Sequence, residues 1–385
     1  MASVAELQRA IPVLDLKAQY EIIQEEIQIA IDAVLQRQHF ILGPEVEKLE
    51  QEIAKYCGCR FGVGVASGTD ALILGLRACG IGPGDEVIVP SFTFIATADT
   101  VSLVGATPVF ADIDPETFNI GPRQIQERIT SRTKAVIPVH LYGQAADMEP
   151  ILALAKTHNL KIIEDSAQAI GATYRERRVN SLGNLGCISF FPSKNLGAYG
   201  DGGMVVTDSQ EIYSHLRSLR SHGSRKKYFS EEQGWNSRLD ELQAAILRVK
   251  LRHLDQWIRQ RQAAAERYDG LLKGLPGVMT PKRSGFGSHV FHQYTIRVPH
   301  RDQVQQDLAG RGVSTMIYYP IPIHLQPIYA HLGHRRGDLP VTEQACEQVL
   351  SLPMFPELLE EQSKYVAEAL GLALANTSGE RKNCG

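Results

Sequence analysis

The chain lacks an excess of positive charge and a long apolar run, and each absence excludes a class of protein. Its 40 lysines and arginines face 43 aspartates and glutamates, so no basic surface indicates nucleic-acid binding. No apolar run approaches the roughly 20 residues that a membrane helix needs. Residues 1–6 have neither the basic region nor the apolar core of a signal peptide. We therefore expect a cytoplasmic protein that binds neither nucleic acid nor membrane.

Cysteine is also scarce, with six residues scattered along the chain. Cys57 and Cys59 are too close together for a redox or zinc pair of the CxxC type, and no other cysteine lies near them in sequence. The sequence therefore predicts free thiols in a reducing compartment and no metal site.

Short apolar runs alternate with helical patterns through the first half of the chain. Two helices are expected first, at residues 20–35 and 45–56. Strands are then predicted at 61–66, 86–90, 107–111, 133–138 and 161–164, with helices at 71–78, 94–103 and 148–158. Such alternation is typical of an α/β fold whose mostly parallel sheet is covered on both faces.

The pattern changes after Trp235. Residues 239–271 form a long stretch of helical periodicity, which we expect to bridge two domains. Beyond it, strands are predicted at 292–298 and 314–317, and helices at 302–311, 341–350 and 362–374. We therefore assign residues 1–255 to an N-terminal segment plus a large α/β domain. Residues 256–375 form a smaller α+β domain in this prediction, and 376–385 a disordered tail.

One lysine and one aspartate indicate pyridoxal phosphate chemistry. Lys194 lies in a glycine-punctuated loop about 30 residues after Asp165, which ends an apolar run. A lysine amine forms a Schiff base with the cofactor aldehyde, and a carboxylate keeps the pyridine nitrogen protonated so that the ring accepts electrons. Glu164 is the competing carboxylate. A strand alternates its faces, so only one of the two points at the cofactor.

A phosphate site is predicted where a strand passes into a helix, at residues 67–70. The backbone N–H groups of Gly68 and Thr69 can point at an anion there. An ordinary capped turn is the alternative interpretation of this segment.

Five segments in this order resemble the motifs of a known family, the DegT/DnrJ/EryC1/StrS pyridoxal-phosphate-dependent nucleotide-sugar aminotransferases. They are residues 68–72, 90–94, 164–168, 189–203 and 234–238. The resemblance runs from about Ile11 to about Leu370 and implies fold type I, as in aspartate aminotransferase. It also selects Asp165 over Glu164. A subset of the family carries His in place of Lys194 and performs dehydration, so Lys194 favours transamination, in which its amine is the general acid and base.

The resemblance implies further cofactor contacts. Gln168 approaches the cofactor ring or its phenolic oxygen, and Gln at this position tends to accompany 3-amino sugar formation. Ser189 binds the phosphate. Phe94 stacks on the pyridine ring, with Phe92 as the alternative two residues away. Asn236 is supplied by the partner subunit, which implies a homodimer with shared active sites.

Substrate contacts are predicted at two places, the first of them by resemblance. Tyr318 and His324 lie in a segment near the sugar nucleotide, with a structured surface loop as the alternative. His222 and Arg225 are candidates for the substrate diphosphate.

The sequence thus predicts transfer of an amino group, with glutamate as the donor, to a keto group of a nucleoside-diphosphate-linked deoxysugar, with a 3-keto sugar favoured. One alternative keeps the cofactor but acts on a keto-cyclitol or another non-nucleotide sugar. The other alternative is a non-catalytic regulatory binder of the same fold.

Overall fold

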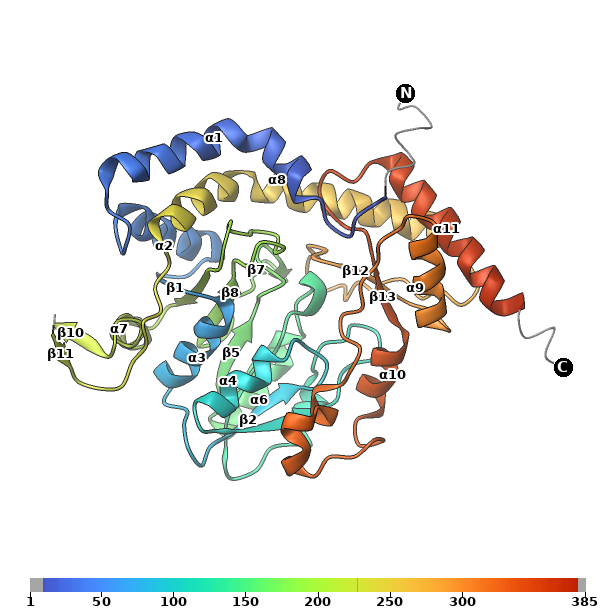
Figure 1. The fold of residues 1–385 in the computed structure, drawn as a ribbon. Helices are drawn as coiled ribbons and strands as arrows, with labels where there is room; N and C mark the ends of the chain where they lie inside the picture. Colours follow the sequence, from blue (N-terminus) through green and yellow to red (C-terminus); the bar gives the residue numbers. More distant parts are fainter. Residues whose placement is uncertain (1–9, 227, 380–385) are drawn as a thin grey trace.

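A seven-stranded sheet forms the centre of the molecule (Figure 1). The computed structural model describes residues 10–226 and 228–379. The strands lie in the order β1 (Phe61–Val65), β9 (Gly203–Thr207), β8 (Leu185–Ser189), β5 (Lys161–Asp165), β4 (Thr133–Val136), β2 (Glu86–Pro90) and β3 (Thr107–Ala111). Of these seven, β9 alone runs antiparallel to its neighbours. The predicted mostly parallel sheet is confirmed.

Helices cover both faces of this sheet because its strand residues are apolar on both sides. On one face, Val87, Val89 and Ile163 pack with α3 (Gly68–Ala78), α4 (Ala96–Leu103) and α7 (Gln210–Leu219). On the other, Ile88 and Ile162 pack with α2 (Pro44–Cys57), α6 (Met148–His158) and the first half of α8 (Glu241–Leu272). The short helix α5 (Pro122–Gln126) also lies on this second face. Alternate residues of one strand thus serve opposite cores.

The long helix α8 joins the two parts of the molecule, as expected. It crosses one side of the fold in Figure 1, with α1 (Leu16–Arg37) beside its first half and α11 (Glu360–Gly379) near its end. Its residues Leu247 and Leu254 belong to the core of the large sheet, whereas Tyr268 and Leu272 belong to a separate C-terminal core. That second core also contains β12 (Tyr294–Arg297), paired with β13 (Val349–Leu352), and α9 (Arg301–Gly310). The boundary predicted at residue 255 falls inside this continuous helix.

Several predicted elements in the C-terminal part were wrong. Residues 314–317 form no strand, and Met316 makes only an isolated bridge with Ser351. The helix predicted at 341–350 ends at Gln348 in α10 (Pro340–Gln348), because the apolar run that follows pairs with β12 as β13. The predicted disordered tail begins inside α11, where Asn376 Nδ2 donates to Asp307 Oδ2 at 2.7 Å. Residues 380–385 lie outside the described residues.

The remaining elements are short. They comprise the hairpins β6 (Thr173–Tyr174) with β7 (Arg177–Arg178) and β10 (Ser224–Lys226) with β11 (Phe229–Ser230), and the 3-10 turns η1 (Leu141–Gly143), η2 (Ile323–Leu325) and η3 (Pro327–Leu332). Among the described residues, no helix has the length and apolar character needed to span a bilayer. The five cysteines of that part of the chain are free.

Candidate active site

A cavity of about 350 Å³ opens where β5 and β8 end. In α/β sheets, functional groups gather at these carboxyl ends of the strands. The cavity is lined by eight of the residues that the sequence analysis singled out: Gly68, Thr69, Phe94, Asp165, Gln168, Ser189, Lys194 and Tyr318.

In the part of the chain that the structure describes, Lys194 is the only lysine that lines this cavity. It is half-buried in the loop that follows β8, and its backbone N–H donates to the Phe191 carbonyl at 2.8 Å. Desolvation lowers the pKa of its amine to about 8, although the negative charge of Asp165 acts in the opposite direction. On the far side of the loop, Lys250 Nζ of α8 donates to the Gly197 carbonyl at 2.5 Å. The loop therefore presents an amine that loses its proton more readily than an ordinary lysine.

The two adjacent carboxylates of β5 face opposite sides of the sheet. Asp165 lines the cavity, where its Oδ2 accepts from Thr97 Oγ1 at 2.9 Å and its Oδ1 from the Ala167 N–H at 3.1 Å. Burial raises the pKa of this carboxyl, and both hydrogen bonds and the charge of Lys194 oppose that shift. Asp165 is therefore an acidic group held out of water beside an amine.

Glu164 is fully buried, and protein groups satisfy both of its oxygens. Its carboxylate accepts from the backbone N–H groups of Asn180, Leu182 and Gly183 at 2.7 to 2.9 Å. His140 Nε2 lies 2.9 Å from the second oxygen. Glu164 thus holds the 180–183 loop and has no group left for a ligand.

The start of α3 lies directly against Ser189. Ser67 caps the helix by accepting from the Asp70 N–H at 3.0 Å. The amides of Gly68 and Thr69 belong to the first turn, where a helix offers no carbonyl partner. A Cβ at Gly68 would lie 2.5 Å from the Cβ of Ser189, so only glycine permits this approach. A helix start and a hydroxyl beside one cavity suit an anion such as phosphate.

Two neighbouring phenylalanines have different environments. Phe94 lines the cavity and is 54% exposed, whereas Phe92 is 1% exposed and packs in the core. The Phe94 ring lies 6.1 Å from that of Tyr319, whose hydroxyl accepts from Gln168 Nε2 at 3.0 Å. Gln168 Oε1 accepts in turn from the Tyr142 N–H at 2.7 Å. Phe94 is therefore the ring available to a ligand.

Several cavity residues were missed by the sequence analysis. Tyr319 directly follows the predicted Tyr318, and Thr97 orients Asp165 from the first turn of α4. His292 and Gln293 reach the cavity from the segment before β12, and no local motif indicates them. Burial lowers the pKa of His292 well below that of a free imidazole, with Lys194 acting in the same direction.

Three predicted residues lie outside this cavity in the single chain. Asn236 is exposed in a separate hollow that includes Asp201 and Arg238. His222 is exposed before the projecting β10–β11 hairpin, and Arg225 lies on β10 (Figure 1). Arg225 Nε lies 3.6 Å from a carboxylate oxygen of Glu231. None of these three residues lines the cavity of its own chain.

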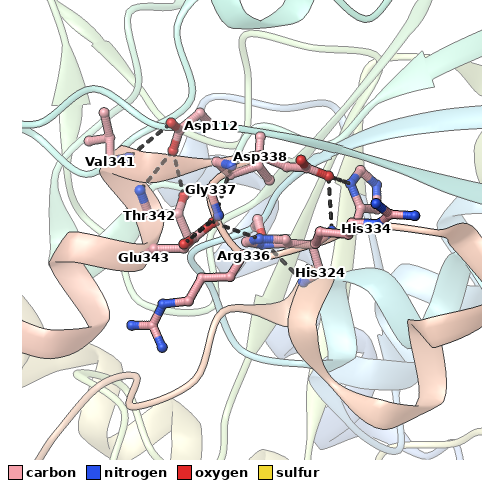
Figure 2. A network of polar contacts seen from close by, with 12 residues as sticks. Asp112, His324, His334, Arg336, Gly337, Asp338, Val341, Thr342 and Glu343 are labelled. Carbon is pink, nitrogen blue, oxygen red and sulfur yellow. Dashed lines mark hydrogen bonds and ion pairs between the residues drawn. The ribbon is translucent and has the colours of Figure 1, made fainter.

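His324 does not reach the cavity either, contrary to the prediction of a substrate contact. Its side chain is buried, and protein groups partner both ring nitrogens (Figure 2). Nδ1 lies 2.7 Å from Ser91 Oγ, and Nε2 lies 3.2 Å from Glu343 Oε1. The ring is fully occupied within the protein, so it is not open to a substrate.

The cavity residues fit pyridoxal phosphate. Lys194 offers an amine of lowered pKa for the aldehyde, and buried Asp165 offers an acceptor for a protonated ring nitrogen. Phe94 offers an exposed ring face, and Gly68 with Ser189 offers a close-packed anion site. The aldehyde, the ring nitrogen, the ring face and the phosphate of the cofactor thus each find a chemically suitable group in one cavity.

Comparison with known proteins gives the same answer over nearly the whole chain. Residues 21–371 match the model of the DegT/DnrJ/EryC1/StrS aminotransferase family. A pleiotropic regulatory protein of Geobacillus stearothermophilus is 54% identical over 362 residues, covering 94% of this chain and 97% of the relative. A UDP-N-acetyl-3-dehydro-alpha-D-glucosamine 3-aminotransferase of Acidithiobacillus ferrooxidans is 52% identical, covering 94% and 97%. The crystal structure of S. venezuelae DesV with a ketimine intermediate superposes with a TM-score of 0.93 at 47% identity, covering 95% and 98%.

Proposed function

The chain belongs to the DegT/DnrJ/EryC1/StrS aminotransferase family of pyridoxal phosphate enzymes, and we propose that it moves an amino group from glutamate to the 3-keto group of a nucleotide-linked sugar. The observation that carries this proposal is the pairing of Lys194 and Asp165 in one cavity beside the start of α3. When bound, pyridoxal phosphate supplies a ring that accepts electrons from the carbon bearing the nitrogen.

The residues of the cavity divide the remaining work. Asp165 holds the proton on the cofactor ring nitrogen, because a buried carboxylate favours a cation beside it. Lys194 Nζ would take the proton from the substrate carbon that bears nitrogen and hold it for return, and the order of these proton transfers would reverse for the second substrate. Phe94 would hold the cofactor ring in place, and Gly68, Thr69 and Ser189 would bind its phosphate. Thr97 holds Asp165 by the hydrogen bond at 2.9 Å.

Two observations support a 3-keto sugar as the acceptor. The relative from Acidithiobacillus ferrooxidans is named for amination at carbon 3. Gln168, not a histidine, occupies the position between Tyr142 and Tyr319 beside the cavity. An amide is neutral at every pH, so this contact does not change its charge during the reaction, and by the family resemblance a glutamine here accompanies 3-amino sugar formation.

We further propose that the active species is a homodimer. Asn236 is exposed and lies near Asp201, which also lines the cavity of Lys194. His222 and Arg225 face solvent on the segment that leads to the projecting hairpin. A two-fold dimer, the commonest oligomer, would bring these three residues to the site of the partner subunit.

A non-catalytic regulatory role is the second candidate, since one relative carries a regulatory name. The two candidates differ in turnover. Purified protein with pyridoxal phosphate should show a visible absorbance band that Lys194→Ala removes, and borohydride should fix the cofactor on Lys194. A panel of UDP- and dTDP-linked 3-keto and 4-keto sugars, with a keto-cyclitol, then tests the acceptor. Amination of the 3-keto sugars with glutamate is expected. A cofactor band without turnover of any acceptor would favour the regulatory role.

A further inference from the structure

Ser91, His324 and Glu343 form a buried hydrogen-bonded chain outside the lining of the cavity. Figure 2 shows His324 and Glu343 of this chain. We propose that His324 and Glu343 are positioning residues, which set Tyr318 and Tyr319 at the cavity for the sugar acceptor. The kinetic part of this proposal rests on the proposed function of the cavity. The geometric part, which concerns where Tyr319 lies beside a bound cofactor, does not.

The hydrogen bonds of the chain assign its protons. Ser91 Oγ accepts from the backbone N–H of His324 at 3.1 Å, so its own proton is free to go to Nδ1 of the same residue at 2.7 Å. Nδ1 is then an acceptor, and the ring proton belongs on Nε2. Nε2 donates that proton to Glu343 Oε1 at 3.2 Å. The chain therefore runs from hydroxyl to neutral imidazole to carboxylate, in agreement with the burial that lowers the pKa of His324.

The carboxylate end of the chain is anchored in the C-terminal part of the fold. Glu343 accepts from the Gly337 N–H at 2.8 and 2.9 Å and from the Leu339 N–H at 3.3 Å. Its helix α10 begins beside Asp112, which accepts from the backbone of Val341 and Thr342 at 3.0 and 2.8 Å (Figure 2). Glu343 is thus a fixed point from which His324 is oriented.

Other titratable groups also surround His324. The His334 ring lies 5.7 Å away, and its Nδ1 is 3.4 Å from an oxygen of Asp338. Charge on His334 opposes a second charge on His324, while Asp338 and Glu343 favour it. Burial outweighs both carboxylates, so the imidazole stays neutral and the direction of the chain is preserved.

The imidazole end of the hydrogen-bonded chain is connected along the backbone to both aromatic walls of the cavity. The Ile323 N–H donates to the Ser91 carbonyl at 3.0 Å, which fixes the 323–324 turn to the end of β2. Pro320 and Pro322 lie between this turn and Tyr319, and proline restricts φ, so displacement of the turn passes along a stiff segment. Ser91 is also three residues before Phe94. The contact of Ser91 with the 323–324 turn therefore fixes the position of the Tyr319 ring, which lies 6.1 Å from that of Phe94. It also fixes the Tyr319 hydroxyl, which accepts a hydrogen bond from Gln168.

Burial excludes a hydrolytic role for the hydrogen-bonded chain of Ser91, His324 and Glu343. Serine hydrolases place the same three kinds of group in the same order. Here Ser91 has no exposed surface, and its hydroxyl oxygen already accepts a backbone hydrogen bond. The Ser91 hydroxyl therefore cannot reach a substrate carbonyl. The remaining role for the hydrogen-bonded chain is to position the residues that line the cavity.

Three substitutions separate the links of the chain. His324→Asn keeps an acceptor near Ser91 but is too short to reach Glu343. His324→Gln keeps a donor toward Glu343 and loses the bond from Ser91. Glu343→Gln is the mildest change, since it keeps the size and one acceptor oxygen. Glu347→Gln is the matched control, because Glu347 lies on the same helix in an exposed ion pair with Arg336.

The readouts are steady-state kinetics, melting temperature and the visible circular dichroism of bound pyridoxal phosphate. Loss of one buried hydrogen bond corresponds to roughly a tenfold change in binding. We expect KM for the nucleotide keto sugar to rise about tenfold in both His324 variants, with kcat changed less. The dichroism should change in the same variants, and Glu347→Gln should match the wild type in all three measurements.

Two results would overturn the proposal. One is wild-type KM and dichroism in folded His324→Asn, His324→Gln and Glu343→Gln. The other is a loss of kcat in proportion to the unfolded fraction with KM and dichroism unchanged, which indicates a role in stability alone. If the wild-type enzyme aminates no sugar, the proposed function fails. The dichroism of the variants then still decides whether the hydrogen-bonded chain positions the tyrosines at the cavity.

Discussion

Lys194 in the cofactor-free protein is expected to titrate near pH 8, far below an ordinary lysine. Desolvation in the cavity favours the neutral amine, while the nearby charge of Asp165 favours the cation. Asp165→Asn removes only the second influence. The variant should therefore lower the pKa of Lys194 further.

The magnitude follows from the shift of the Lys194 pKa from 10.5 to about 8. At pH 7 the free-base fraction rises from roughly 1 in 3,000 to roughly 1 in 10, or about 300-fold. The same pKa shift makes the stability of the cofactor-free protein depend on pH. Between about pH 8 and 10.5 the unfolded chain holds a proton that the folded chain has lost, so the cofactor-free protein gains stability as the pH rises through this window.

Competitive labelling of the cofactor-free protein measures this titration directly. A trace of acetic anhydride reacts only with free amines, and mass spectrometry of the Lys194 peptide against pH gives the midpoint. Asp201→Asn is the matched control, since Asp201 lines the same cavity but is not among the charges that shift the pKa of Lys194. A wild-type midpoint near 10.5, or one that Asp165→Asn leaves in place or raises, would refute the reasoning.

Three further predictions concern the fold, the phosphate site and the assembly. Glu164→Gln should destabilise the protein by about 3 kcal/mol in urea unfolding, because it places an amide donor against backbone N–H groups, yet it should keep the cofactor band when folded. Gly68→Ala should weaken pyridoxal phosphate binding about tenfold in a fluorescence titration, since its Cβ meets Ser189, whereas Gly270→Ala in α8 has open space and should change nothing. Mixing inactive Lys194→Ala with inactive Asn236→Asp should restore some activity by subunit exchange; verified exchange without rescue would contradict a shared site.

Local sequence patterns were sufficient to predict five of the seven strands of the central sheet, but they missed β8 and β9 in that sheet and β13 in the C-terminal part. The strands β2, β3 and β5 are buried on both faces, so each appears in the sequence as an unbroken apolar run bounded by helical periodicity. The apolar segment Val349–Leu352 follows the helix α10 directly, with no glycine or proline between them. It becomes a strand only because β12, more than 50 residues away, offers a partner.

The site divides in the same way. The spacing of Lys194 and Asp165 and the glycine at position 68 are sequence features, because the chemistry and the close approach to Ser189 each demand one residue type. The local sequence around Thr97, His292 and Tyr319 does not require these residue types. They reach the cavity from three distant segments, and only the packing of those segments brings them together.

The sequence alone indicated the fold class, the cofactor and the lysine that we propose reacts with it, since these depend on residue type and on order along the chain. Only the tertiary structure decided which neighbour of a pair faces the cavity, as with Phe94 over Phe92, and which polar group is already satisfied, as with Glu164. The structure also placed His324 outside the lining of the cavity. A side chain is available to a ligand only when no long-range partner has taken its hydrogen bonds, and partners such as Ser91 and Glu343 are 233 and 19 residues away from His324 in the chain.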